Sequence, residues 1–300
     1  MLKIAHSKIY AHPLPEGHRF PMLKYELIPE QLLRSGIIEE SNLFEPSAAD
    51  EAIVLLTHDE KYVEELKTLS LDEKHIRRIG FPLSEELVKR EFIICGGSIQ
   101  CCDFAIAHGV SMNTAGGTHH AFSNKGEGFC LLNDMAVAAN YLLHNQKAAK
   151  ILFIDLDVHQ GNGTASLFEK NKNVFTFSMH GKNNFPFFKE QSDLDIELND
   201  GCEDEEYLFL LQHHLSSIFK NFKPDFVFYN SGVDILSTDK LGKLKISEQT
   251  CYQRDRFVFE LCKNAKTPVV TAMGGGYSSK ISDIVNAHCN TFRAAVETFF

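Results

Sequence analysis

Six short runs of apolar residues recur along the chain and predict the strands of a buried sheet. They cover residues 52–57, 110–114, 150–155, 174–179, 225–230 and 268–273. Residues 151–154 are all apolar, which indicates a strand that is covered on both faces, as parallel strands usually are. Helical patterns at 134–144, 203–219 and 247–262 lie between several of these runs. The alternation predicts a three-layer α/β fold, with a central parallel sheet between layers of helices.

Two further segments, 12–21 and 182–195, follow neither pattern and are rich in Pro, Phe or charged residues. We expect ordered loops there, and long loops in compact domains are often functional. No repeat and no Pro/Gly/Ser-rich linker interrupts the chain. We therefore expect a single domain over residues 1–300.

Two carboxylates and an imidazole alternate at the end of the strand predicted at 150–155, as Asp155, Asp157 and His159. Burying an ionised carboxylate is costly unless it is paired, hydrogen-bonded or bound to a cation. Alternate side chains of a strand point the same way but start roughly 6 to 7 Å apart, so at most two neighbours can share one ion. A third ligand must come from elsewhere. Asp234, which follows the strand at 225–230, is the candidate, although a lone Asp in such a place is more often a helix cap or a turn residue.

Two other polar motifs also follow predicted strands. His119 and His120 come after 110–114. Such a pair is an acid/base device with a carboxylate behind it, part of a solvated loop, or a hydrogen-bonded structural pair. Three glycines precede Tyr277 after the run at 268–273, and they form either a flexible turn or a mobile loop that presents the Tyr hydroxyl to a developing oxyanion. Each motif alone favours the structural alternative, but packing does not explain why all of them fall at strand ends.

The ligand types in these motifs point to a chemistry. An Asp/His/Asp set without Cys suits a borderline cation such as Zn²⁺, and three protein ligands leave one position open for water. The motifs together therefore predict metal-assisted hydrolysis.

Composition narrows the function classes further. The chain of 300 residues has a net charge of −10 and a pI near 5.8, which argues against direct nucleic-acid binding. No run is long enough to span a bilayer, and the N-terminal residues lack a signal-peptide pattern, so we expect a cytoplasmic protein. The eight cysteines are scattered without a C-x-x-C spacing, and we expect reduced thiols in the core.

The order of these motifs resembles that of the histone deacetylase family over nearly the whole chain. The matching segments are Gly116–His120, Gly128–Cys130, Asp155–Gly163, Ser178–His180, Gly232–Asp234 and Gly275–Tyr277. The resemblance implies the arginase/deacetylase α/β fold with a narrow acyl-lysine tunnel above the metal. Gln160 and Asn162 stand where many relatives carry His and Asp, which resembles the class IV branch and its bacterial homologues.

The resemblance also implies roles for single residues. Asp157, His159 and Asp234 would be the zinc ligands, while Asp155 would orient His119 and, with Ser178, contribute to a site for a monovalent cation such as K⁺. His120 would be the general base, with the neutral Asn162 behind it, and Tyr277 would polarise the substrate carbonyl. Phe129 and Phe185 would line the tunnel, Gly128 would leave room for the alkyl chain, and Arg19 would lie near an internal product cavity.

The sequence thus predicts a zinc-dependent amidohydrolase that removes an acetyl or longer fatty acyl group from the ε-amine of lysine, in a peptide or protein. Two alternatives stay open. One is an enzyme that acts on small acylated amines such as acetylpolyamines, and the other is a non-catalytic acyl-lysine binding protein. The shape and charge of the tunnel mouth would discriminate the first alternative from the main hypothesis.

Overall fold

One sheet of eight parallel strands forms the centre of the computed structural model, which describes residues 1–300. The strands stand in the order β2-β1-β3-β8-β7-β4-β5-β6. Their bounds are β1 Lys3–Ala5, β2 Leu43–Phe44, β3 Val110–Asn113, β4 Ile151–Asp155, β5 Val174–Gly181, β6 Leu194–Leu198, β7 Phe226–Asn230 and β8 Val269–Ala272. Because every pair is parallel, all carboxyl ends meet at one edge of the sheet.

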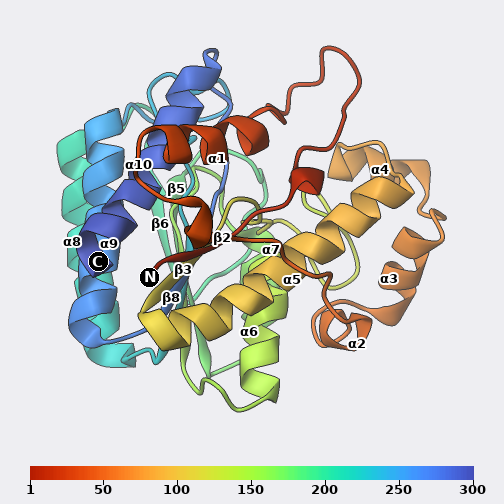
Figure 1. Ribbon diagram of the computed structural model, residues 1–300, viewed down its shortest axis with the longest axis horizontal. Helices are drawn as coiled ribbons and strands as arrows, with labels where there is room; N and C mark the ends of the chain where they lie inside the picture. Colours follow the sequence, from red (N-terminus) through yellow and green to blue (C-terminus); the bar gives the residue numbers. More distant parts are fainter.

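Helices cover both faces of this sheet, as Figure 1 shows. One layer holds α1 Lys24–Arg34, α8 Asp204–Phe222, α9 Glu248–Ala265 and α10 Ile281–Phe299. The other holds α5 Glu85–His108, α6 Asp134–His144 and α7 Asn162–Phe168, and the short helices α2 Glu51–Val54, α3 Glu60–Lys67 and α4 Glu73–Ile79 pack beyond α5. The predicted three-layer α/β architecture is therefore confirmed.

The alternation of side chains along β4 explains why the strand is apolar throughout. Leu152 and Ile154 belong to the hydrophobic cluster shared with α1, α8, α9 and α10. Ile151 and Phe153 belong to the cluster on the opposite face, with α5, α6 and α7. Successive side chains of a strand point to opposite faces, so a strand between two helical layers must be apolar at every position.

The strand predicted at 52–57 was wrong. Asp50 accepts a hydrogen bond from the Ala52 amide and so caps the short helix α2, which continues into turns. Its apolar residues, with Val54 fully buried, pack in a third cluster with α3 and α5. A short apolar run does not by itself distinguish a strand from a buried helical turn.

Four strands whose carboxyl ends are adjacent carry the polar motifs. β3, β8, β7 and β4 lie side by side, and the segments that follow them contain His119 and His120, Tyr277, Asp234, and Asp157 with His159. Parallel α/β sheets bind ligands at this edge. No helix combines the length and the apolar character needed to cross a bilayer.

Candidate metal centre and active site

Asp157, His159 and Asp234 form a compact group of potential metal ligands. His159 Nδ1 lies 2.9 Å from Asp157 Oδ1 and 3.1 Å from Asp234 Oδ2. Bonds of about 2 Å in a tetrahedral site place ligand atoms about 3.3 Å apart, so the observed spacing fits such a site. Asp157 and Asp234 are almost completely buried, at 2% and 0% exposure. The segment after β4 supplies two of the three groups, and the segment after β7 supplies the third.

The charges of this group call for a cation. Burial alone would lower the pKa of His159, but the carboxylates of Asp157 and Asp234 raise it to about 10. Burial and the neighbouring Asp157 carboxylate raise the pKa of Asp234. Two buried carboxylates that share one imidazole are compensated best by a positive charge between them. The donor set therefore fits a divalent cation of the zinc type.

Asp155 lies behind this group and contacts His119. One carboxylate oxygen of Asp155 lies 2.6 Å from His119 Nδ1, and the other accepts hydrogen bonds from the Asp157 amide and from Asn230 Nδ2. Although burial opposes it, the Asp155 carboxylate, with that of Asp157, raises the pKa of His119 to about 8. The three alternating residues Asp155, Asp157 and His159 are thus not equivalent, because Asp155 faces His119 and is absent from the ligand group.

His120 is hydrogen-bonded to the neutral side chain of Asn162, which is in turn hydrogen-bonded to the carboxylate of Glu127. Its Nδ1 lies 2.7 Å from Asn162 Oδ1, and Asn162 Nδ2 donates to Glu127 Oε1 at 2.7 Å. A carboxylate only accepts, so the amide oxygen of Asn162 faces His120, and His120 Nδ1 carries the proton. Burial, followed by the neighbouring imidazoles of His119 and His159, lowers the pKa of His120 well below its ordinary value. The result is a neutral imidazole whose Nε2 is free to accept a proton.

The glycines before Tyr277 allow the backbone to approach the carboxylates. A Cβ added to Gly275, where φ is +54°, would lie 2.1 Å from Asp234 Oδ2 and 2.8 Å from Asp157 Oδ2. Lys24 Nζ donates to the Gly275 carbonyl, and Asp239 Oδ2 accepts from the Tyr277 amide at 2.6 Å. The segment is therefore a fixed support for Tyr277, in contrast to a freely mobile loop.

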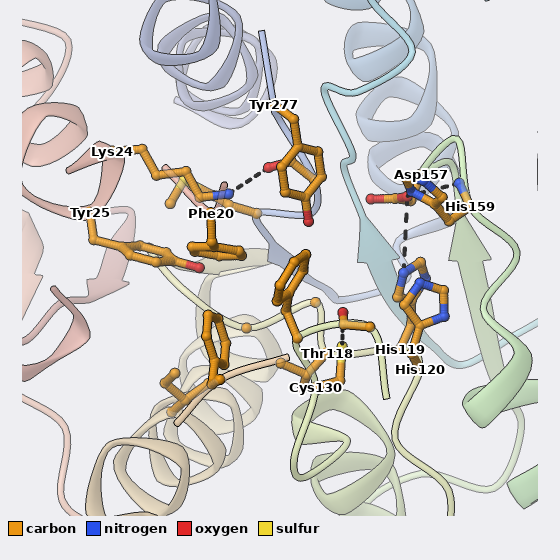
Figure 2. Close-up of a pocket in the computed structure, with 18 of the residues that line it drawn as sticks. Phe20, Lys24, Tyr25, Thr118, His119, His120, Cys130, Asp157, His159 and Tyr277 are labelled. Carbon is orange, nitrogen blue, oxygen red and sulfur yellow. Dashed lines mark hydrogen bonds and ion pairs between the residues drawn. The ribbon is translucent and has the colours of Figure 1, made fainter. Parts of the chain in front are cut away.

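Two cavities meet at these side chains. An inner cavity of about 40 Å³ reaches from His119 and Asp157 to Lys24 and Tyr25, which Figure 2 shows on opposite sides of the pocket. An outer cavity of about 440 Å³ opens toward Arg78 and Lys243. The lining residues common to both are His120, Gly128, Phe129, His159 and Tyr277. The candidate site therefore lies at a constriction between an outer mouth and an inner pocket.

Comparison with known proteins agrees with this architecture. The model of the histone deacetylase domain matches residues 18–292. The chain belongs to the histone deacetylase family. An uncharacterized protein of Picosynechococcus sp. is 44% identical over 290 residues, which are 97% of each chain. Histone deacetylase 2 of Arabidopsis thaliana is 29% identical and aligns with 89% of this chain and 72% of its own length.

A solved structure supports the fold. The structure of an HDAC homolog from Aquifex aeolicus superimposes with a TM-score of 0.85, over 98% of this chain and 84% of the other, at 24% identity. The arginase/deacetylase fold of the histone deacetylase family, expected from the sequence, is therefore confirmed. Membership also places the protein among hydrolases of that family.

Of the three residues expected to form the tunnel of a histone deacetylase, Gly128 and Phe129 lie at the constriction, and Phe185 lines the outer cavity beside it. A Cβ on Gly128, where φ is +58°, would stand 2.6 Å from His120 Cδ2, so the glycine makes room for the imidazole itself. The Phe185 ring packs edge-on to His120 at 5.0 Å. Phe129 has a left-handed φ of +68°, and its amide donates to Ile79. Backbone strain of this kind is typical of functional sites.

Arg19 lies elsewhere than expected. Its guanidinium stacks 4.9 Å from the centre of the Phe129 ring and lines the outer cavity. The basic side chains at the inner cavity are instead Lys24 and Arg90. The position inferred for Arg19 from the histone deacetylase resemblance was therefore wrong, since the ring of Phe129 separates it from the interior.

Ser178 lies beside Asp155 as a partner in the β4–β5 register. Both residues line a cavity of about 10 Å³ that also includes Asn230, and Ser178 Oγ lies 2.9 Å from His180 Nδ1.

The eight cysteines are all free and buried.

The sequence patterns missed Glu127, Lys24 and Arg90. Glu127 stood in a short glycine-rich stretch that indicated only a turn. Lys24 and Arg90 are buried basic residues on α1 and α5, where charged side chains usually face water. Only Asn230 had a signal, because it ends a predicted strand beside the other polar motifs.

Proposed function

We propose that the protein is a zinc-dependent lysine deacylase, of the class IV-like or bacterial type, that hydrolyses the amide of an acylated lysine side chain. The observation that supports it most is the position of a neutral, oriented His120 and of Tyr277 around the ligand group Asp157, His159 and Asp234. When bound there, zinc would supply a Lewis acid that lowers the pKa of water and polarises an amide carbonyl.

The protein side chains then have separate roles: His120 transfers protons, and Tyr277 and His119 donate hydrogen bonds. His120 Nε2 accepts a proton from the attacking water, because its Nδ1 proton is committed to Asn162. It later donates a proton to the departing lysine amine. The Tyr277 hydroxyl donates a hydrogen bond to the amide oxygen where negative charge develops. His119, paired with Asp155, supplies a second donor beside the reacting group.

The inner cavity favours a short acyl group. Its volume of about 40 Å³ has room for on the order of three water molecules. An acetyl group has three non-hydrogen atoms, whereas a myristoyl group has fourteen carbons and would require the walls formed by Tyr25 and Ile94 to move. We therefore propose acetyl-lysine ahead of long-chain acyl-lysine.

Two further assignments are proposals with narrower support. Asp155 and Ser178, with backbone carbonyls, would hold a monovalent cation such as K⁺ at the small cavity between β4 and β5. The eight buried free thiols suit a reducing compartment, which supports the cytoplasm as the location.

A peptide series tests the proposed function. Metal-loaded protein should hydrolyse acetyl-lysine peptides faster than butyryl, octanoyl or myristoyl analogues. Tyr277→Phe should lower kcat about 100- to 1,000-fold, as expected for loss of one oxyanion donor. Tyr252→Phe removes a hydroxyl that bonds Glu297 at a half-buried position of α9, away from both cavities, and should have no such effect. Equal activity of Tyr277→Phe and wild type would refute the proposed mechanism.

A further inference from the structure

The mouth of the outer cavity is basic, although the chain as a whole carries a net charge of −10. Arg19, Arg78 and Lys243 line this cavity, and no Asp or Glu is among its lining residues. All three side chains are exposed. Since acidic residues outnumber basic ones overall, the charge at this place is opposite to the average surface.

Two of these cations have no acidic partner. Neither Arg19 nor Arg78 forms an ion pair in the structure, whereas Arg77, the neighbour of Arg78 on α4, pairs with Glu73 at 2.8 Å. Arg19 is anchored on the Phe129 ring. The Arg78 carbonyl accepts from the Gly128 amide at 3.1 Å, so this residue is tied to the tunnel wall. The Arg19 guanidinium is thus held on the Phe129 ring, and the Arg78 backbone is held beside the tunnel, where its side chain lines the outer cavity.

The outer cavity also has a third cation and exposed aromatic surface. Lys243 Nζ donates to the Asn183 carbonyl at 2.9 Å and forms an exposed ion pair with Asp200 at 3.9 Å, so its charge is partly compensated. Phe187, which also lines this cavity, is 84% exposed, and its neighbour Phe188 is 92% exposed. Exposed aromatic rings beside a cavity are typical of contacts with a bound chain.

We propose that the natural substrate is an acyl-lysine flanked by acidic residues in a peptide or protein chain. This inference depends on the deacylase activity proposed above and specifies its substrate class. A buried acyl-lysine carries no charge, so the segment at the mouth determines the electrostatic fit. An acidic segment complements Arg19, Arg78 and Lys243. An acetylpolyamine would bring a second ammonium group to the same mouth, where like charges repel.

The expected preference is moderate because the cations are exposed. An exposed ion pair changes an equilibrium constant by at most about fivefold. A peptide with two flanking acidic residues should therefore have a kcat/KM roughly tenfold higher than a peptide with two flanking basic residues. The difference should shrink as ionic strength rises, since the Debye length falls to about 8 Å at 0.15 M salt.

The experiment compares three acetyl-lysine peptides that differ only in their flanking residues, Glu, Gln or Lys, together with N-acetylspermidine. We measure kcat/KM with zinc-loaded full-length protein at about 20 mM and 300 mM salt. At low salt the order should be Glu, then Gln, then Lys, with N-acetylspermidine the poorest substrate. The spread should narrow at high salt.

Charge reversal at adjacent positions of α4 supplies a matched control. Arg78→Glu should reduce the ratio of kcat/KM between the Glu and Lys peptides by about two- to fivefold, because it reverses one of the three charges at the mouth. Arg77→Glu changes the net charge equally but lies outside the cavity lining, so it should retain the wild-type ratio. Equal effects of the two variants would show a general charge effect and overturn the assignment of the mouth.

The outcomes separate this inference from the proposed function. Hydrolysis of all three peptides at the same rate, or a preference for the Lys peptide or N-acetylspermidine, would overturn the acidic substrate while leaving the deacylase intact. Hydrolysis of none of the peptides by zinc-loaded protein would overturn the deacylase and the acidic substrate with it.

Discussion

Replacement of Asn162 by Asp tests how His120 is held. Asn162 connects His120 to Glu127 through two hydrogen bonds of 2.7 Å each, and its amide NH₂ group is the donor to Glu127. In Asn162→Asp the donor is lost, and two carboxylates face each other at the same distance. The isosteric change therefore introduces a repulsion that is absent from the wild type.

The size of this repulsion follows from the geometry. Two charges about 4 Å apart repel by about 4 kcal/mol at an effective dielectric constant of 20. Protonation of one of the two carboxylates would remove this repulsion. Binding a proton at pH 7 to a carboxyl with an ordinary pKa near 4.3 costs about 4 kcal/mol. Glu127 is only half-buried, and water at its side reduces the repulsion. We expect Asn162→Asp to lower the free energy of unfolding by about 2 to 4 kcal/mol at neutral pH.

The sign of the pH dependence provides a second criterion. Repulsion raises the pKa of one carboxyl in the folded Asn162→Asp protein above its unfolded value, so the folded state binds more protons. The loss of stability should be complete at pH 7.5 and should disappear as the pH falls toward about 4.

A second substitution should rescue the first. Glu127→Gln alone should cost little, because the Gln carbonyl can accept from Asn162. In Glu127→Gln/Asn162→Asp the Gln amide donates to the Asp carboxylate, which still accepts from His120 Nδ1. Denaturant unfolding of all four proteins at pH 7.5 yields the coupling energy. The double variant should regain most of the lost stability, and its pH–rate profile should shift its acid limb to higher pH, because a carboxylate raises the pKa of His120.

Additive effects of the two substitutions would refute the proposed His120–Asn162–Glu127 connection. So would an Asn162→Asp protein as stable as the wild type at pH 7.5. An unchanged acid limb in the double variant would show that the group behind His120 does not tune its basicity.

Two further predictions concern a backbone position and a buried histidine. Gly128→Ala should lower activity at least about tenfold, because the added Cβ would stand 2.6 Å from His120 Cδ2. Gly36→Ala is the control: Gly36 has a similar positive φ and no atom within 4 Å of the added Cβ, so this variant should keep full activity and lose only about 1 kcal/mol of stability in denaturant unfolding. Equal activities of the two variants would contradict the steric argument. Burial lowers the pKa of His58 to about 4, so the folded state resists protonation, and stability should fall by about 3 kcal/mol as the pH falls from 6.5 to 4. In His58→Asn, the free energy of unfolding measured with urea should no longer fall in this way between pH 6.5 and 4. The same fall in His58→Asn and wild type would exclude His58 as its source.

Sequence periodicity and burial costs predicted five of the eight strands and much of the site, but not β1, β2 or β6. The apolar run before Asp155 required a two-sided strand, and the spacing of Asp157 and His159 required a further ligand from another strand end. Asp234 lies there in the structure. Such inferences succeed because they depend on strand geometry, which is the same in every parallel sheet.

Features that depend on side-chain direction or on distant segments could not be predicted. The run at 52–57 became helical because Asp50 caps it locally. Arg19 lies outside the Phe129 ring, and Glu127 meets Asn162 across 35 positions of sequence. The charge of the mouth likewise arises where loops far apart in the sequence meet, so no local pattern indicates it.

Zinc-dependent hydrolysis at the group Asp157, His159 and Asp234 is tested most directly by measuring zinc content and acetyl-lysine hydrolysis together in wild type and Asp157→Asn. We expect about one zinc ion per wild-type chain, with activity that is lost on chelation and recovered in proportion to the zinc added back. Asp157→Asn should fold, bind little zinc and have no measurable activity. Wild-type protein that is free of metal and fully active would contradict the claim.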